Sequence, residues 1–181
     1  CILKSKWDSL SVAPSNLDLA GAEIELVSAF NRERLLDGAI SSVISDYDFV
    51  LIDCPPSIGL LTVNALTAAS EVLVPIQCEY LALEGLGQLL SNVERVKNHL
   101  NKDLHISTIA LVMFDARTKL AGQVVEEIRS HFGERVCQQT VPRSVRLSEA
   151  PSYGQPIIYY DSSSRGAIAY RSLAKEITGG A

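Results

Sequence analysis

Short, continuous apolar runs alternate along the chain with longer stretches in which apolar residues recur every three or four positions. Residues 49–52 read Phe-Val-Leu-Ile, and residues 72–76 and 106–113 have the same β-branched character. Runs of this kind are typical of strands buried on both faces of a parallel sheet. A weaker strand is predicted at 136–141, and a short one at 9–13.

The intervening stretches have the periodicity of amphipathic helices. Residues 80–100 form the longest of them, with leucines and valines at helical spacing. Gly133 follows the helix predicted at 119–132 and is a typical stop signal. Asp18 and Ser57 are candidate N-caps for two of the remaining helices. Those helices are predicted at 19–29, 32–45, 59–69 and 163–177.

The order of these elements predicts an α/β fold, with a mostly parallel sheet and helices on both faces. The sequence contains no internal repeat or linker, so residues 1–181 are predicted to form a single domain. A sheet of this kind normally begins with a strand and a phosphate-binding turn. The sequence has no G-x-x-x-x-G-K-[ST] motif and begins at Cys1. We therefore expect that a front portion of the domain is absent from this chain.

Composition narrows the class of protein. With 47% hydrophobic and 20% charged residues the chain is not intrinsically disordered. The 4 cysteines are spaced too widely for a disulfide framework or a zinc site, so free thiols in a reducing cytoplasm are expected. Residues 1–116 hold 7 Lys/Arg against 15 Asp/Glu, whereas residues 117–181 hold 9 against 6. This basic bias indicates either an anion-binding face or scattered solvated charges.

The sharpest chemical signal is Asp53. The apolar residues 49–52 bring its carboxylate to the C-terminal end of a predicted strand, where α/β folds place their ligands. In P-loop ATPases an aspartate at this place holds Mg²⁺ or its water shell. The alternative is that Asp53 caps the helix that follows the Pro-Pro turn.

Three arginines follow predicted strands. Arg117 lies on a strand-end loop, and Arg143 and Arg146 share a face if their segment forms one helical turn. Arginines at loop tips can bind phosphate oxygens through two parallel hydrogen bonds. The alternative is ion pairing at the surface, with Glu149 or Asp115 as the partners.

Five segments carry motifs of a known family: residues 14–23, 52–57 (IDCPPS), 77–86 (QCEYLALEGL), 114–118 (FDART) and 142–152 (PRSVRLSEAPS). Together they resemble the ParA/Soj family, the deviant-Walker ATPases that partition chromosomes and plasmids. The resemblance runs in order from about residue 8 to 178 and covers the later part of the family's ATPase domain. It implies a P-loop NTPase fold of the SIMIBI/MinD-like type that lacks its N-terminal strand and P-loop.

The resemblance implies a nucleotide site. Asp53 matches the Walker B aspartate, which lies near Mg²⁺ and the attacking water and serves as both metal and catalytic residue. The adenine-binding segments of the family are matched by Met113, Phe114, Pro142 and Arg143. ATP and Mg²⁺ are therefore the expected cofactors, but only where a P-loop is present.

The resemblance also implies partners. Arg117 and Arg146 match the arginines through which the ATP-bound homodimer binds double-stranded DNA nonspecifically, in agreement with the basic bias. Such binding is expected to depend strongly on salt and little on sequence. A ParB-type partner is expected to stimulate slow ATP hydrolysis. The implied location is the bacterial cytoplasm, in association with the nucleoid and not with a membrane.

Several alternatives remain. Without P-loop amides and lysines the triphosphate loses most of its donors, so this chain alone is expected neither to bind nor to hydrolyse ATP well. A non-enzymatic interaction module, left as a remnant of such an ATPase, is one alternative. A MinD-like ATPase at a membrane is another, but residues 178–181 do not supply the bulky amphipathic C-terminal helix that it needs.

Overall fold

The computed structural model describes residues 2–55, 57 and 59–179. These residues form two compact units, divided between Ala69 and Ser70. Cys54, Cys78 and Cys137 are free thiols, as predicted, and Cys1 lies outside the described residues.

The first unit opens with a small antiparallel hairpin in which β1 (Leu3–Lys4) pairs with β2 (Ser11–Val12). This confirms the centre of the short strand predicted at 9–13. Helix α1 (Leu17–Leu26) follows, and its N-cap is Asn16, whose side chain accepts a hydrogen bond from the Asp18 backbone at 3.0 Å. The prediction that Asp18 caps this helix is wrong by two residues.

The single helix predicted at 32–45 is broken into three pieces: η1 (Arg32–Arg34), α2 (Leu35–Ile40) and η2 (Ile44–Asp46). The first break, between η1 and α2, is caused by a side chain from α3 (Leu60–Ala68). The Asn64 amide accepts a hydrogen bond from the Leu36 backbone at 3.1 Å and donates one to the Arg32 carbonyl at 2.7 Å. These backbone groups are therefore bonded to a distant residue instead of to their own helix.

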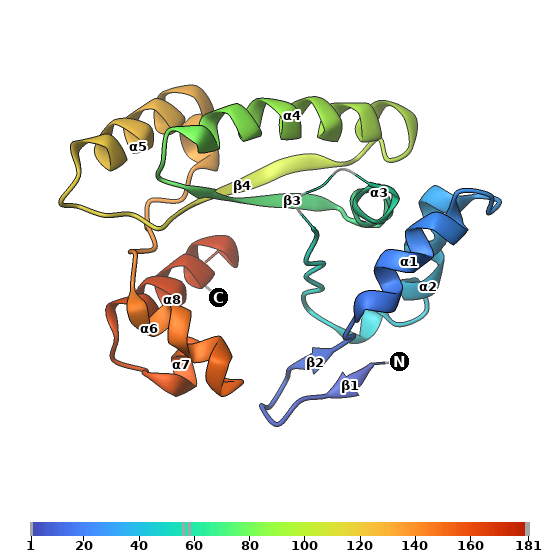
Figure 1. Cartoon of the computed structure of the whole chain (residues 1–181), viewed down its shortest axis with the longest axis horizontal. Coiled ribbons are helices and arrows are strands. Elements are labelled where there is room, and N and C mark those ends of the chain that lie inside the picture. The colour runs from blue at the N-terminus through green and yellow to red at the C-terminus, as the bar shows by residue number, and fades with distance from the viewer. Residues whose placement is uncertain (1, 56, 58, 180–181) are drawn as a thin grey trace. The chain divides into compact units, whose positions relative to one another are not determined.

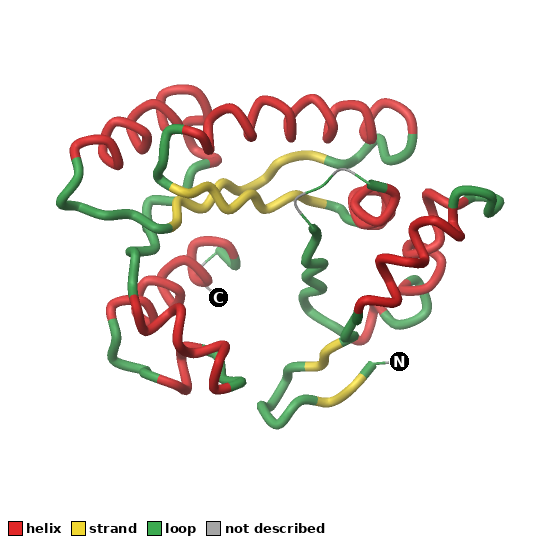
Figure 2. The backbone as a smooth tube through the Cα atoms, in the orientation of Figure 1, coloured by secondary structure: helices red, strands yellow, loops and turns green. Residues whose placement is uncertain are grey.

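Residues 49–52 do not form the predicted buried strand (Figure 2). They pair with no strand among the described residues, and Phe49 and Leu51 are 63% and 88% exposed. A β-strand needs a neighbouring strand to bond its backbone N–H and C=O groups, and a local apolar run does not supply one. The other local prediction here, Ser57 as the cap of α3, is also wrong, because Gly59 occupies that position.

The second unit is built on parallel strands. β3 (Glu71–Gln77) pairs with β4 (His105–Val112), which confirms two predicted strands. The segment predicted as a further strand, 136–141, bonds to the other side of β4: the Cys137 and Val141 N–H groups donate to carbonyls of β4 at 2.9 and 2.8 Å. β4 is thus the central strand, whereas β3 alternates between buried and exposed residues and so is not buried on both faces.

Helices cover both faces of these strands, as predicted. Figure 1 shows α4 (Leu81–His99) running along the β3–β4 pair, with α6 (Val145–Glu149), α7 (Ile157–Tyr160) and α8 (Arg165–Ile177) on the opposite side. On that side Ala169 and Leu173 of α8 pack against Ala110, Cys137 and Val141.

The connections within the second unit include the helix α5 (Lys119–Phe132), which coincides with its predicted bounds and ends at Gly133 with φ 56°. The short helices η3 (Gly133–Arg135) and η4 (Ala150–Tyr153) complete the connections. No helix in the part of the chain that the structure describes is both long and apolar enough to cross a membrane.

Candidate functional site

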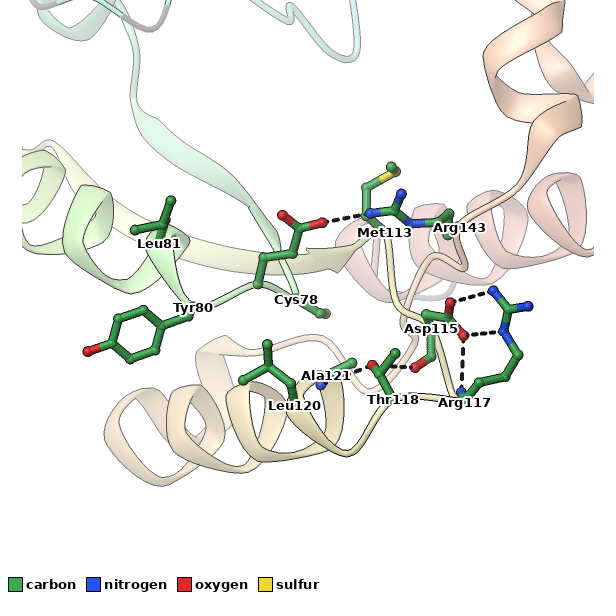
Figure 3. Close-up of a pocket in the computed structure, with 11 residues that line it drawn as sticks. Cys78, Tyr80, Leu81, Met113, Asp115, Arg117, Thr118, Leu120, Ala121 and Arg143 are labelled. Atoms are coloured by element: carbon green, nitrogen blue, oxygen red, sulfur yellow. Dashed lines mark hydrogen bonds and ion pairs between the residues drawn. The ribbon is translucent and has the colours of Figure 1, made fainter.

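A pocket of about 570 Å³ lies at the carboxyl ends of the parallel strands in the second unit (Figure 3). Its lining comes from three connections. Residues 78–81 follow β3, Met113, Asp115 and Arg117 follow β4, and Arg143 follows the segment beside β4. The carboxyl ends of parallel strands are the usual place for a ligand in an α/β fold.

The backbone turns sharply at Met113, where φ is +56°. A residue with a side chain rarely adopts this left-handed conformation, and such strain is often found at functional sites. Directly afterwards Phe114 forms a parallel bridge with Pro142, and the Arg143 N–H donates to the Phe114 carbonyl at 3.0 Å. The four residues predicted to line one pocket thus come together, and Met113 and Arg143 line it.

Arg143 forms an ion pair across the end of β4. Its Nη2 lies 2.6 Å from Oε1 of Glu79, which follows β3. Arg143 does not share a helical face with Arg146, because α6 begins only at Val145, after its N-cap Ser144. That prediction is corrected.

Arg117 curls back onto Asp115 (Figure 3), with its Nε 2.9 Å from Oδ1 and its Nη2 2.7 Å from Oδ2. The Arg117 backbone N–H also donates to Oδ1, at 3.0 Å. These hydrogen bonds and the positive charge hold the pKa of Asp115 well below its usual range. The ion pair predicted as an alternative is therefore present. The Arg117 side chain is nevertheless 87% exposed, and a guanidinium has further N–H groups to offer.

Arg146 is held by two carboxylates and does not line the pocket. Its Nη1 lies 3.0 Å from Oε2 of Glu149, which confirms the other predicted ion pair. Its Nε lies 3.4 Å from Oδ2 of Asp161, a partner that the sequence analysis did not identify. The structure thus brings Arg117, but not Arg146, to the pocket.

The sequence analysis also missed Glu79 and its neighbours Cys78 and Tyr80 as lining residues. Their position in the sequence could have identified them, because they directly follow a predicted strand, as Asp53 does. Burial raises the pKa of the Cys78 thiol to about 11.

Asp53 belongs to the first unit and is exposed, directly after residues 49–52. Within the described residues, no group of three or more His, Cys, Asp or Glu side chains is arranged to hold a metal ion.

Comparison with known proteins extends this picture. A family model described as an AAA domain matches residues 1–106. The chain is 55% identical to the sporulation initiation inhibitor protein Soj of Bacillus subtilis over 170 residues, which are 94% of this chain and 67% of Soj. It is 53% identical to the chromosome partitioning protein ParA of Myxococcus xanthus over 168 residues, 93% of this chain and 59% of that protein. The chain therefore spans about three fifths to two thirds of the length of these relatives.

Two solved structures resemble the fold. Cobyrinic acid a,c-diamide synthase from Mycobacterium smegmatis, solved with bound ADP and magnesium, has a TM-score of 0.79 and 34% identity, covering 99% of this chain and 67% of its own. The cell division ATPase MinD of Pyrococcus furiosus has a TM-score of 0.76 and 23% identity, covering 99% and 70%. These likenesses confirm the predicted MinD-like P-loop NTPase fold. The chain belongs to the Soj/ParA family of chromosome-partitioning ATPases.

Proposed function

We propose that this chain supplies the nucleobase pocket and the DNA-binding arginines of a ParA-type partition ATPase. The observation that carries the proposal is the meeting of Met113, Arg143 and Arg117 at one pocket on the carboxyl ends of the parallel strands. The high identity to Soj and ParA supports the same function.

The pocket has the chemistry that an adenine base requires. Leu81, Met113 and Leu120 offer apolar surface for the faces of the ring. The carboxylates of Glu79 and Asp115 are hydrogen-bond acceptors, which suit the exocyclic amino group of adenine. Guanine has the acceptor O6 at that place, so it would have to turn in the pocket to bring its own N1–H and N2–H groups to these carboxylates.

The chain offers fewer binding groups for the phosphates of the nucleotide than for its base. The sequence contains no P-loop, and the described residues contain no metal cluster. We therefore expect the base to bind and the triphosphate to add little affinity in this chain alone. When a P-loop is present, Asp53 is the residue proposed to lie near Mg²⁺ and the attacking water, and ATP hydrolysis becomes possible.

The nucleotide proposal is tested with the only methionine of the chain, because the methyl signal of Met113 needs no assignment in a spectrum of ¹³C-methyl-methionine protein. Adenosine is expected to shift this signal with an affinity of roughly millimolar, as a small ligand without phosphate contacts would. Guanosine is the matched control, and an equal shift would mean that the pocket does not distinguish adenine from guanine. If neither nucleoside moves the signal, the pocket does not bind a base.

The same titration with a Mg²⁺–ATP analogue tests the role of the absent P-loop. We expect binding no more than about tenfold tighter than that of adenosine. Micromolar binding would show that donors for the triphosphate exist elsewhere in this chain.

The DNA part of the proposal is that an ATP-dependent homodimer binds nonspecific double-stranded DNA through Arg117 and Arg146. A ParB-type partner would then stimulate hydrolysis, and the protein would associate with the nucleoid. The exposed guanidinium of Arg117 supports this role, since it can bond phosphate oxygens without first being uncovered.

A further inference from the structure

Arg146 sits in a cluster with more negative than positive charge. Its Nη1 is 3.0 Å from Glu149, one turn later on α6, and its Nε is 3.4 Å from Asp161, the C-cap residue of α7. The Tyr160 hydroxyl donates to the same Glu149 oxygen at 3.2 Å. Two carboxylates thus face one guanidinium, and the group carries one net negative charge.

Arg117 gives the contrast. It is paired with Asp115 alone, so that pair is neutral. A phosphate that approaches Arg117 meets no excess charge, whereas a phosphate that approaches Arg146 is repelled by one uncompensated carboxylate.

Hydrogen bonds and ring stacking hold Asp161 and Tyr160 in place beside Arg146. The Asp161 N–H donates to the Ile157 carbonyl at 2.9 Å, and the Asp161 carbonyl accepts from the Ser164 hydroxyl at 2.8 Å. Tyr160 is held by stacking on Tyr153, with ring centroids 5.0 Å apart. These contacts fix the backbone of Asp161 and the ring of Tyr160, and so keep both carboxylates within reach of Arg146.

The two carboxylates are not equivalent. Glu149 has the shorter contact with Arg146 and a second hydrogen bond from Tyr160. Asp161 has the longer contact with the guanidinium, at 3.4 Å, and its second hydrogen bond, from the Ser163 hydroxyl, is also long at 3.4 Å. An incoming phosphate oxygen would therefore displace Asp161 more readily than Glu149, and it would use the Nε that Asp161 gives up.

We propose that Asp161 restrains phosphate binding by Arg146, so that DNA must replace this carboxylate as the second partner of the guanidinium. The proposal rests on the proposed DNA-binding role of Arg146. It adds that the affinity for DNA is set by an internal competitor, a residue 15 positions away in the sequence, and not by the arginine alone.

The test uses the 181-residue chain, a fluorescently labelled 20-base-pair duplex and low salt, with binding read by anisotropy. At low salt the arginines of a single chain are expected to bind phosphates weakly even without the ATP-dependent dimer. Asp161→Asn keeps the size and an acceptor oxygen but removes the charge. It is expected to tighten DNA binding about three- to tenfold. Glu126→Gln, an equal charge change on the exposed face of α5, is the matched control and is expected to change binding less than about twofold.

A double-mutant cycle with Arg146→Ala separates a local effect from a general one. If Asp161 acts on Arg146, the gain from Asp161→Asn disappears in the Arg146→Ala background. An equal gain in both backgrounds overturns the proposal, as does unchanged or weaker binding by Asp161→Asn. Asp161→Ser provides a second neutral variant, and circular dichroism checks that each variant folds.

The restraint by Asp161 and the DNA-binding role of the chain have different negative results. If the unaltered chain binds the duplex and Asp161→Asn gives no gain, only the restraint by Asp161 is wrong. If neither protein binds at low salt, the DNA-binding role of this chain is wrong and the restraint falls with it.

Discussion

Asn64 shows how much one side chain decides in this protein. It is 4% exposed on α3, and its amide bonds to the Leu36 N–H, to the Arg32 carbonyl and to the Leu60 carbonyl. The first two of these bonds span 28 and 32 residues of sequence and connect α3 to α2 and η1. They are the reason why a helix predicted as continuous begins only at Leu35.

Replacing this residue should therefore destabilise the first unit. Asn64→Leu keeps the branching at Cγ but removes three hydrogen bonds, two of them to other elements, at an expected cost of about 2–3 kcal/mol. Urea unfolding measures the cost, and hydrogen exchange should speed up at the Leu36 amide. Asn98→Leu is the control, because Asn98 is exposed and should cost less than about 0.5 kcal/mol. Unchanged exchange at Leu36 would contradict this account.

Cys78 carries the pH prediction. Burial raises its pKa from 9.0 to about 11, because the thiolate is disfavoured in the folded protein. The stabilisation from the buried neutral thiol is therefore complete below pH 9 and is lost as pH rises through about 11. Alkylation of native protein with iodoacetamide should follow a midpoint near 11 at Cys78, read by peptide mass spectrometry in a Cys1→Ser background. Exposed Cys54 should react first at pH 8, and equal rates would argue against burial of Cys78.

At the scale of elements, α6 and α8 pack through a residue without a side chain. A Cβ added to Gly166 would lie 2.7 Å from Cγ of Leu147. Real Cβ contacts do not approach so closely, so the two helices touch at this point only because residue 166 is glycine. The contact holds α6, and with it Arg146, against α8.

Two glycine-to-alanine changes should therefore have opposite signs. Gly166→Ala gains helix propensity but overpacks the contact, with an expected net loss of about 1–2 kcal/mol. Gly122→Ala on α5 meets nothing within 4 Å and should gain about 0.5–1 kcal/mol. Urea midpoints of the two variants test this. Stabilisation by both would mean that Leu147 moves aside at little cost.

At the scale of the whole molecule, charge sets how DNA can bind. The chain has a net charge of −5, so general attraction to DNA is unfavourable and any binding must come from local arginines. Arg117→Ala and Arg146→Ala should each weaken binding about equally on different sequences. Each should also reduce the slope of log K against log salt by about one. Arg135→Ala, on η3, serves as the control, and an equal loss with this variant would point to net charge instead of specific contacts.

Sequence reasoning succeeded where the signal is local. The bounds of α5 and the stop at Gly133 follow from periodicity and from a glycine with φ 56°, both of which are properties of neighbouring residues. It failed at residues 49–52 and at 32–45, where the outcome depends on a partner elsewhere. An apolar segment without a neighbouring strand cannot form the backbone hydrogen bonds of a sheet. At the start of a helix, the amide of a distant residue such as Asn64 can form the hydrogen bonds that would otherwise link one turn to the next.

The candidate site divides in the same way. The amino-acid sequence was sufficient to identify the family, the parallel strands of the second unit and the grouping of Met113 with Arg143. Motifs and strand ends can be recognised from consecutive residues, so these predictions needed no knowledge of tertiary contacts. Tertiary packing was required to show that Glu79 pairs with Arg143, 64 residues away, and that Asp161 faces Arg146. Such ion pairs depend on which loops meet in space, and local sequence patterns do not predict which loops come into contact.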